Sequence, residues 1–408
     1  MSQTKHPRII LRRGKEESIL RYHPWIFSGA IQSISVSTSD SREKGGELDE
    51  GEIVDVYSNQ AKFLGRGHYS SGSIAVRILS FKDVELDDAW WQERLQQAYQ
   101  LRCSLQLTGS EDTTCYRLVH GEGDSLAGLI IDIYGSTAVV QCHSAGMYNS
   151  RAQIAKALCA IYGSKLEAIY DKSASTLPNA LQNGVVDSYL YGQNKGQEEV
   201  LENGNKFLIN WEKGQKTGFF IDQRENRELV ARYAKGRKVL NTFCYTGGFS
   251  VYALSAGASH VDSVDSSARA VELADDNVKL NFGDSAPHTP VAEDAFEYLK
   301  KIDQSYDLII LDPPAFAKHH RVVGNALQAY KRLNARAMQQ IKPGGILFTF
   351  SCSQAVSKEQ FRTAIFSAAA IAGRNVSILH QLTQPADHPI SIYHPEGEYL
   401  KGLVVYVE

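Results

Sequence analysis

The sequence predicts an α/β protein with a doubly wound parallel sheet in its C-terminal half and two smaller domains before it. After Gly236, segments typical of strands alternate with segments typical of helices, which is the pattern of a parallel sheet covered by helices. Residues 308–311 are four consecutive apolar residues, as in a strand buried on both faces. Residues 51–69 and 73–81 instead alternate apolar and polar side chains, as half-buried antiparallel strands do. We therefore expect three domains, at residues 1–82, 83–192 and 193–408.

The composition is that of an ordinary globular protein, with 43% hydrophobic and 22% charged residues among 408. The formal net charge is −3, so the chain has no overall basic excess that would indicate nucleic acid. A basic cluster near the N-terminus is either a solvated surface, which charge alone favours, or an RNA contact. Its members are Lys5, Arg8, Arg12, Arg13, Lys15 and Arg21.

None of the six cysteines belongs to a C-x-x-C pair, which argues against a zinc site and against a disulfide scaffold. We therefore expect no metal. No apolar run reaches membrane-spanning length, and the N-terminus lacks the apolar segment of a signal peptide. These observations predict a cytoplasmic protein without a membrane partner, and they leave the oligomeric state open.

Short strands and one helix are expected in the first domain, with the helix interrupted at Pro24 and an exposed polar loop at residues 37–50. An amphipathic helix over residues 87–107 leads to a middle domain of strands and helices. Part of this middle domain is either a polar loop, which the sequence favours, or a segment facing the active site. It contains Arg117, His120, Glu122 and Asp124.

A hairpin is expected at residues 195–220, followed by the loop GQKTGFFIDQREN and a helix. Asp222 lies near the start of that helix and Arg224 within its first turn. Such a loop is able to embrace an adenosyl group or a phosphate, and it equally suits a domain linker.

The strand after Gly236 ends in the turn NTFCYTGG, which lacks the glycine spacing of dinucleotide-binding proteins. The expected cofactor contacts are this turn and the acidic ends of the next two strands, where a carboxylate is able to bind ribose hydroxyls. No P-loop lysine pattern is present. The order of these features favours S-adenosylmethionine over NAD. The residues are Phe243, Tyr245, Thr246, Gly247, Asp265, Ser266, Asp294 and Ala295, and each of the acids is alternatively a helix cap.

The strand at residues 308–311 ends at Asp312-Pro313-Pro314, because proline cannot donate to a ladder. This places a carboxylate at the carboxyl end of a central strand, where open α/β sheets bind their ligands. Cys352 follows the next predicted strand, so it and Asp312 are expected to open onto one crevice. A cysteine between two serines there favours a nucleophile over a buried apolar residue.

The first domain, with its basic first strand, HPWIF, GEIVDV and LGRGHY, resembles a PUA domain, an RNA-binding module. Over nearly the whole chain, KGQKTGFFIDQREN, VLNTFCYTGGFSV, the Asp-Pro-Pro segment and FSCS resemble the RNA 5-methylcytosine methyltransferases of the ribosomal large-subunit methyltransferase I family. The resemblance implies a PUA domain, an α+β middle domain and a Rossmann-like S-adenosylmethionine domain. It also implies methylation of one cytosine in large-subunit ribosomal RNA.

The resemblance implies that Cys352 is the nucleophile, that Asp312 is the acid of the proline motif, and that Asp265 and Asp294 contact the cofactor. Asp222, Arg224 and Asp312 are also expected to contact the cofactor. Expected substrate contacts are Pro313, Pro314, Lys318, Arg12 and Arg13. Related RNA cytosine methyltransferases carry a second cysteine beside the proline motif. Ala315 stands there instead, so the base that removes the carbon 5 proton is unassigned.

Two other functions remain open from the sequence. Methylation of an exocyclic base amine uses an Asp-Pro-Pro motif without a cysteine, and an aromatic residue directly after the prolines would favour it; here Ala315 precedes Phe316. The other alternative is an RNA-binding protein with a catalytically silent Rossmann domain. The target nucleotide and the choice between naked RNA and an assembled subunit are not fixed by the sequence.

Overall fold

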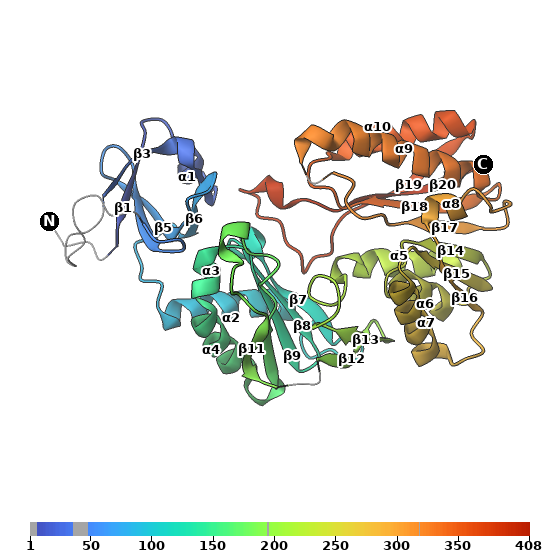
Figure 1. Ribbon diagram of the computed structural model, residues 1–408, viewed down its shortest axis with the longest axis horizontal. Coiled ribbons are helices and arrows are strands. Elements are labelled where there is room, and N and C mark those ends of the chain that lie inside the picture. The colour runs from blue at the N-terminus through green and yellow to red at the C-terminus, as the bar shows by residue number, and fades with distance from the viewer. Residues whose placement is uncertain (1–5, 36–47, 194–195, 318) are drawn as a thin grey trace. The chain divides into compact units, whose positions relative to one another are not determined.

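The computed structural model describes residues 6–35, 48–193, 196–317 and 319–408 (Figure 1). The chain forms two compact units. The first comprises the chain up to Glu198 together with Ile209–Phe219 and Ala386–Gly397. The second comprises Glu199–Leu208, Phe220–Pro385 and Glu398–Glu408. No helix in the described ranges is long and apolar enough to cross a membrane.

The N-terminal part of the first unit is a six-stranded sheet in the order β2-β6-β5-β4-β1-β3. Its elements are β1 (Arg8–Leu11), α1 (Glu17–Leu20), β2 (Trp25–Phe27), η1 (Ser28–Ala30), β3 (Ile31–Ser35), β4 (Ile53–Tyr57), β5 (Phe63–Tyr69) and β6 (Ile74–Ser80). Alternate side chains of these strands, such as Ile9, Leu11, Val54 and Val56, form the core. Helix α1 ends before the expected stop at Pro24, because Tyr22 adopts a left-handed φ of 64° that cannot continue a helix.

The middle part of the first unit is a five-stranded sheet in the order β11-β10-β9-β8-β7. Its elements are α2 (Asp88–Ser104), β7 (Cys115–His120), η2 (Gly121–Asp124), β8 (Leu129–Tyr134), β9 (Thr137–Cys142), α3 (Ala145–Asn149), α4 (Arg151–Tyr162), η3 (Gly163–Lys165), β10 (Ala168–Asp171), η4 (Asn179–Leu181) and β11 (Ser188–Gly192). The predicted helix α2 is confirmed. Its N-cap Asp87 accepts a hydrogen bond from the backbone of Trp90, and Trp90 and Trp91 pack into the core.

The polar loop expected around Arg117 is a wrong prediction. Arg117 lies in β7 and forms a bidentate ion pair with the buried Asp132. Its Nε and one terminal nitrogen donate to the two carboxylate oxygens, at 2.8 and 2.9 Å. Asp124 forms a similar pair with Arg102, whose side chain is fully buried. Arg117 and Asp124 in this segment therefore form internal ion pairs and are not exposed to solvent. The order of residues along the chain does not distinguish these two cases.

The remaining elements follow Gly196. They are the hairpin β12–β13, the elements of the second unit, and the short η7, which belongs to the first unit. The elements are β12 (Gln197–Glu202), β13 (Asn205–Asn210), η5 (Ile221–Gln223), α5 (Arg224–Ala234), β14 (Lys238–Thr242), α6 (Gly248–Ser255), β15 (His260–Asp265), α7 (Ala268–Phe282), β16 (His288–Ala292), α8 (Ala295–Tyr298), β17 (Leu308–Leu311), η6 (His320–Val322), α9 (Val323–Gln340), β18 (Gly345–Ser351), α10 (Lys358–Ala372), β19 (Val376–Leu382), η7 (Pro395–Gly397) and β20 (Lys401–Val407).

The second unit is a seven-stranded sheet in the order β16-β15-β14-β17-β18-β20-β19. All neighbouring strands from β16 to β18 run parallel, and β20 is antiparallel to both β18 and β19. Figure 1 shows α9 and α10 on one side of this sheet and α5, α6 and α7 on the other. The doubly wound prediction is confirmed. The strand order reverses between β14 and β17, and ligands of such sheets bind at that point, beyond the carboxyl ends of the strands.

Candidate active site at the strand ends of the second unit

The turn after β14 has an unusual backbone. Phe243 and Tyr245 adopt left-handed φ angles of 55° and 45°, and Gly247 one of 75°. A Cβ on Gly247 would lie 2.9 Å from the Cβ and 3.0 Å from the Cα of Ala274, so only glycine lets the turn pack on α7. Non-glycine residues in this region of φ are strained, and such strain gathers where a ligand is held.

Asp265 stands at the end of β15 and is tied to this turn. Its Oδ2 accepts a hydrogen bond from the backbone of Tyr245 at 3.2 Å, and its Oδ1 accepts one from the backbone of Ser267 at 2.9 Å. The carboxylate is thereby fixed at the edge where ribose hydroxyls bind in this kind of sheet. Ser266 beside it is exposed.

Asp294 follows β16 and caps α8. Its Oδ1 accepts hydrogen bonds from the backbones of Phe296 and Glu297, at 2.9 and 3.1 Å. The capping alternative is thus confirmed, and the cofactor contact of Asp294 and of the buried Ala295 stays a prediction.

Asp312 follows β17 and has an unusual electrostatic environment. Burial raises the pKa of its carboxyl to about 7, and the neighbouring carboxylate of Asp222 acts in the same direction. A hydrogen bond of 3.1 Å from Nε2 of Gln223 to Oδ2 and the charge of Arg227 oppose this effect. Asp312 is therefore able to carry a proton near neutral pH.

Asp222 belongs to η5 and lies beside Asp312. The hydroxyl of Tyr399 donates to its Oδ2 at 2.7 Å. Its Oδ1 is buried and has no hydrogen-bond partner among the described residues. A buried carboxylate oxygen without a donor is rare in folded proteins, and a ligand with an N–H or ammonium group would satisfy it.

A buried ion pair supports the loop that carries Asp222 and Gln223. Nε and one terminal nitrogen of Arg227 donate to the two carboxylate oxygens of Glu202, both at 2.7 Å. The other terminal nitrogen donates to the carbonyl of Phe220 at 3.0 Å, and the hydroxyl of Tyr252 donates to Glu202 at 3.0 Å. Nε of Arg224 lies 3.8 Å from the same carboxylate.

We expect Glu202→Gln to lower the free energy of unfolding by about 3–5 kcal/mol, because it leaves the buried charge of Arg227 without its counter-ion. Chemical denaturation of the full chain measures this. The matched control is Glu228→Gln, which breaks an exposed ion pair of 3.2 Å with Arg232 in the same helix as Arg227 and is expected to change little. Equal effects of the two substitutions would contradict the supporting role of Glu202.

Cys352 follows β18, the neighbour of β17. Its Sγ lies 3.9 Å from the carbonyl oxygen of Pro313, so the thiol faces the proline pair. The ammonium of Lys401 donates to the carbonyls of Ser353 and Val356, at 2.7 and 2.6 Å. Burial lowers the pKa of Lys401 to about 8, and the negative charge of a Cys352 thiolate acts in the opposite direction.

The structure thus brings the turn at residues 243–247, Asp265, Asp222, Asp312 and Cys352 to strand ends or loops of one unit. Pro313 is buried and Pro314 is exposed, whereas Lys318 lies outside the described residues. Arg12 and Arg13 are exposed residues of the other unit. Four residues of the site have roles that no pattern along the chain predicted: Glu202, Gln223, Arg227 and Lys401. Of these, only Gln223 lies in a loop that the sequence predicted to be able to bind a ligand.

These residues fit S-adenosylmethionine. The turn after β14 offers backbone groups at close approach, Asp265 offers a fixed carboxylate for hydroxyls, and Asp222 offers a buried acceptor that lacks a donor. Bound there, the cofactor supplies a methyl group on a positively charged sulfur.

Comparisons with known proteins indicate the same cofactor. Residues 178–390 match the family model of an S-adenosylmethionine-dependent methyltransferase, and residues 9–81 match that of a PUA-like domain. Two solved structures superpose over 98% of this chain and 100% of their own, at 26% sequence identity. One is from Streptococcus mutans, with a TM-score of 0.81, and the other is SMU.776 in complex with SAH, with a TM-score of 0.82.

Curated relatives match over almost their full length. A protein of Pseudoalteromonas atlantica (strain T6c / ATCC BAA-1087), named Ribosomal RNA large subunit methyltransferase I, is 41% identical over 98% of this chain and 99% of its own. A protein of Tolumonas auensis (strain DSM 9187 / NBRC 110442 / TA 4) with the same name is 40% identical over 97% of this chain and 98% of its own. The chain therefore belongs to the ribosomal RNA large subunit methyltransferase I family of S-adenosylmethionine-dependent methyltransferases.

Proposed function

We propose that this protein methylates carbon 5 of a cytosine in large-subunit ribosomal RNA through a covalent adduct on Cys352. The names of its relatives and the PUA-like domain support the RNA substrate. One observation supports this chemistry most directly. The Cys352 thiol lies 3.9 Å from the carbonyl oxygen of Pro313, and Pro313 directly follows Asp312, whose carboxyl has a pKa of about 7. The cytoplasm suits this chemistry, because it keeps cysteines reduced and all six are free here.

The thiol activates a carbon that is otherwise unreactive. The Cys352 thiolate adds to carbon 6 of the cytosine and forms a carbon–sulfur bond. The electrons of the 5,6 double bond form a double bond between carbons 4 and 5, and Asp312 donates its proton to N3, which neutralises the charge that builds up there. Carbon 5 thereby becomes enamine-like and would form a bond to the methyl carbon of S-adenosylmethionine, whose methyl–sulfur bond would break and leave the electron pair on a neutral sulfur.

The ring is then restored. A base removes the proton from carbon 5, the electron pair reforms the 5,6 double bond, and the carbon–sulfur bond breaks. Cys352 leaves as the thiolate, and N3 returns its proton to Asp312. Lys401 stabilises this leaving thiolate from its buried position. The cytosine must be unstacked to reach the thiol, which costs least where the RNA is single-stranded.

The test is methylation of ribosomal RNA taken from cells that lack the gene, either as naked RNA or as intact large subunits, with the product nucleoside identified by mass spectrometry. We expect 5-methylcytidine at one position. N4-methylcytidine or another amine-methylated nucleoside would support exocyclic methylation instead. Absence of product together with absence of S-adenosylmethionine binding in calorimetry would support a catalytically silent RNA-binding protein.

A further inference from the structure

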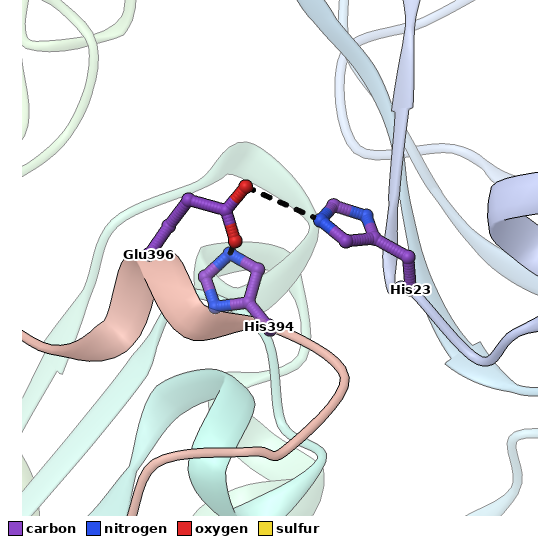
Figure 2. Close-up of side chains that lie close together, drawn as sticks. All are labelled: His23, His394 and Glu396. Carbon is purple, nitrogen blue, oxygen red and sulfur yellow. Dashed lines mark ion pairs between the residues drawn. The ribbon is translucent and has the colours of Figure 1, made fainter.

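Two histidines and a glutamate from distant parts of the chain meet within the first unit (Figure 2). His23 precedes β2, and His394 and Glu396 flank Pro395 at η7. Nε2 of His23 lies 3.5 Å from Oε1 of Glu396, and Nε2 of His394 lies 3.7 Å from Oε2. The three ligand atoms lie within 4.8 Å of one another.

His394 is unusual for a buried histidine. Only 2% of its surface is exposed, yet neither Nδ1 nor Nε2 has a hydrogen-bond partner among the described residues. The ring of Trp25 packs against it with centroids 4.3 Å apart, which fills space but satisfies neither nitrogen. A buried polar group left unsatisfied costs about 1–3 kcal/mol. The contact with Glu396 is too long to be a hydrogen bond.

The spacing of these groups is within reach of a shared metal ion. Zinc binds imidazole nitrogen and carboxylate oxygen at about 2.0–2.2 Å in a tetrahedron, which places its ligands about 3.4 Å apart. Nε2 of each histidine lies near this distance from a different oxygen of Glu396, at 3.5 and 3.7 Å, and one ligand atom from each of the three residues lies within 4.8 Å of the other two. We propose that His23, His394 and Glu396 form a zinc site with water in the fourth position, independent of the methylation site.

The surroundings of His23 determine what kind of site this is. Its Nδ1 accepts a hydrogen bond from the backbone of Trp25 at 3.2 Å, so the neutral ring without metal carries its proton on Nε2. Zinc at Nε2 requires that proton to move to Nδ1 and the contact with Trp25 to lengthen. Because this change costs free energy, it weakens zinc binding. We therefore expect a chelator to remove the ion reversibly.

A zinc ion there would join the segment before β2 to the segment around η7. Both segments are otherwise connected through aromatic contacts among Tyr22, Trp25, Tyr393 and His394. The proposed effect of the ion is to link these two segments, and the readout is metal binding rather than methyl transfer.

The experiment uses the full-length chain without an affinity tag, stripped with EDTA and titrated with zinc sulfate in a calorimeter, with bound metal counted by mass spectrometry. We expect one zinc ion per chain and a higher melting temperature with zinc. His394→Phe and Glu396→Gln should each weaken zinc binding by at least about tenfold.

The matched control is His260→Phe, which removes a histidine that lies 3.2 Å from a carboxylate oxygen of Asp262 but, among the residues that the structure describes, belongs to no group of three possible ligands. It should leave the stoichiometry and affinity unchanged. Failure of the wild-type chain to bind zinc, or unchanged binding by Glu396→Gln, would overturn the proposal. The partly exposed Glu396 keeps the test decisive even if His394→Phe does not fold.

Discussion

Cys352→Ala should abolish methyl transfer, with a loss of about 10⁴-fold or more in kcat, because no other group then makes carbon 5 of cytosine nucleophilic. The sharper readout is covalent capture. RNA with 5-fluorocytosine at the target should form a stable adduct with the wild-type protein, since fluorine on carbon 5 cannot leave as a proton does. Denaturing gels of protein with labelled RNA measure this adduct.

The matched control for capture is Cys103→Ala, which removes an exposed cysteine in the other unit and should leave the adduct intact. Calorimetry with S-adenosylmethionine should show that Cys352→Ala still binds the cofactor. An adduct of normal yield with Cys352→Ala would refute the nucleophile assignment, whereas loss of the adduct in both variants would point to a folding defect.

Asp312→Asn should lower kcat/KM by about 10²–10⁴-fold, because the amide still donates a hydrogen bond to N3 but cannot give up a proton. The pH profile separates these roles. The pKa of Asp312 is about 7, so the fraction of wild-type enzyme with a proton to donate falls as pH rises through 7. This descending limb should vanish in Asp312→Asn.

Asp312→Asn should lower activity but raise the stability of the folded protein at high pH. The folded-state pKa of about 7 lies above the unfolded value near 3.9, so the stability that the protonated carboxyl contributes is present below about pH 4 and lost as pH rises through 7. At pH 8, Asp312→Asn should therefore be the more stable protein, by at most about 4 kcal/mol, and at pH 4 the two should be equal.

Asp307→Asn is the control for this pH dependence. Although partial burial acts the other way, hydrogen bonds from the backbone of Lys238 and the side chain of Lys342 lower the pKa of Asp307. A lowered pKa stabilises the fold at high pH, so this variant should lose stability at pH 8. An identical response of both variants would show that Asp312 is not held in a destabilised, proton-carrying state.

The sequence by itself determined the elements whose cause is local. The four apolar residues before Asp312 and the prolines after it specify a central strand and its end, and β17 is that strand. Helix α9 follows likewise from its residue periodicity, and strand β18 follows from its run of apolar residues. Because parallel strands place their carboxyl ends at one edge, the nearness of Cys352 to the proline pair was also predictable.

Which distant side chains meet depends on how the elements pack in three dimensions. Lys401 reaches the loop after Cys352 because β20 runs antiparallel beside β18, with Ser351 opposite Lys401. Glu202 pairs with Arg227, and His23 meets His394 and Glu396, through packing that no local pattern encodes. The pattern of apolar and polar residues along the chain indicates on which face of its own strand or helix each side chain lies. The pKa of Asp312, the pairing of buried charges and a ligand set shared by remote segments depend instead on three-dimensional neighbours, and these exist only once the chain has folded.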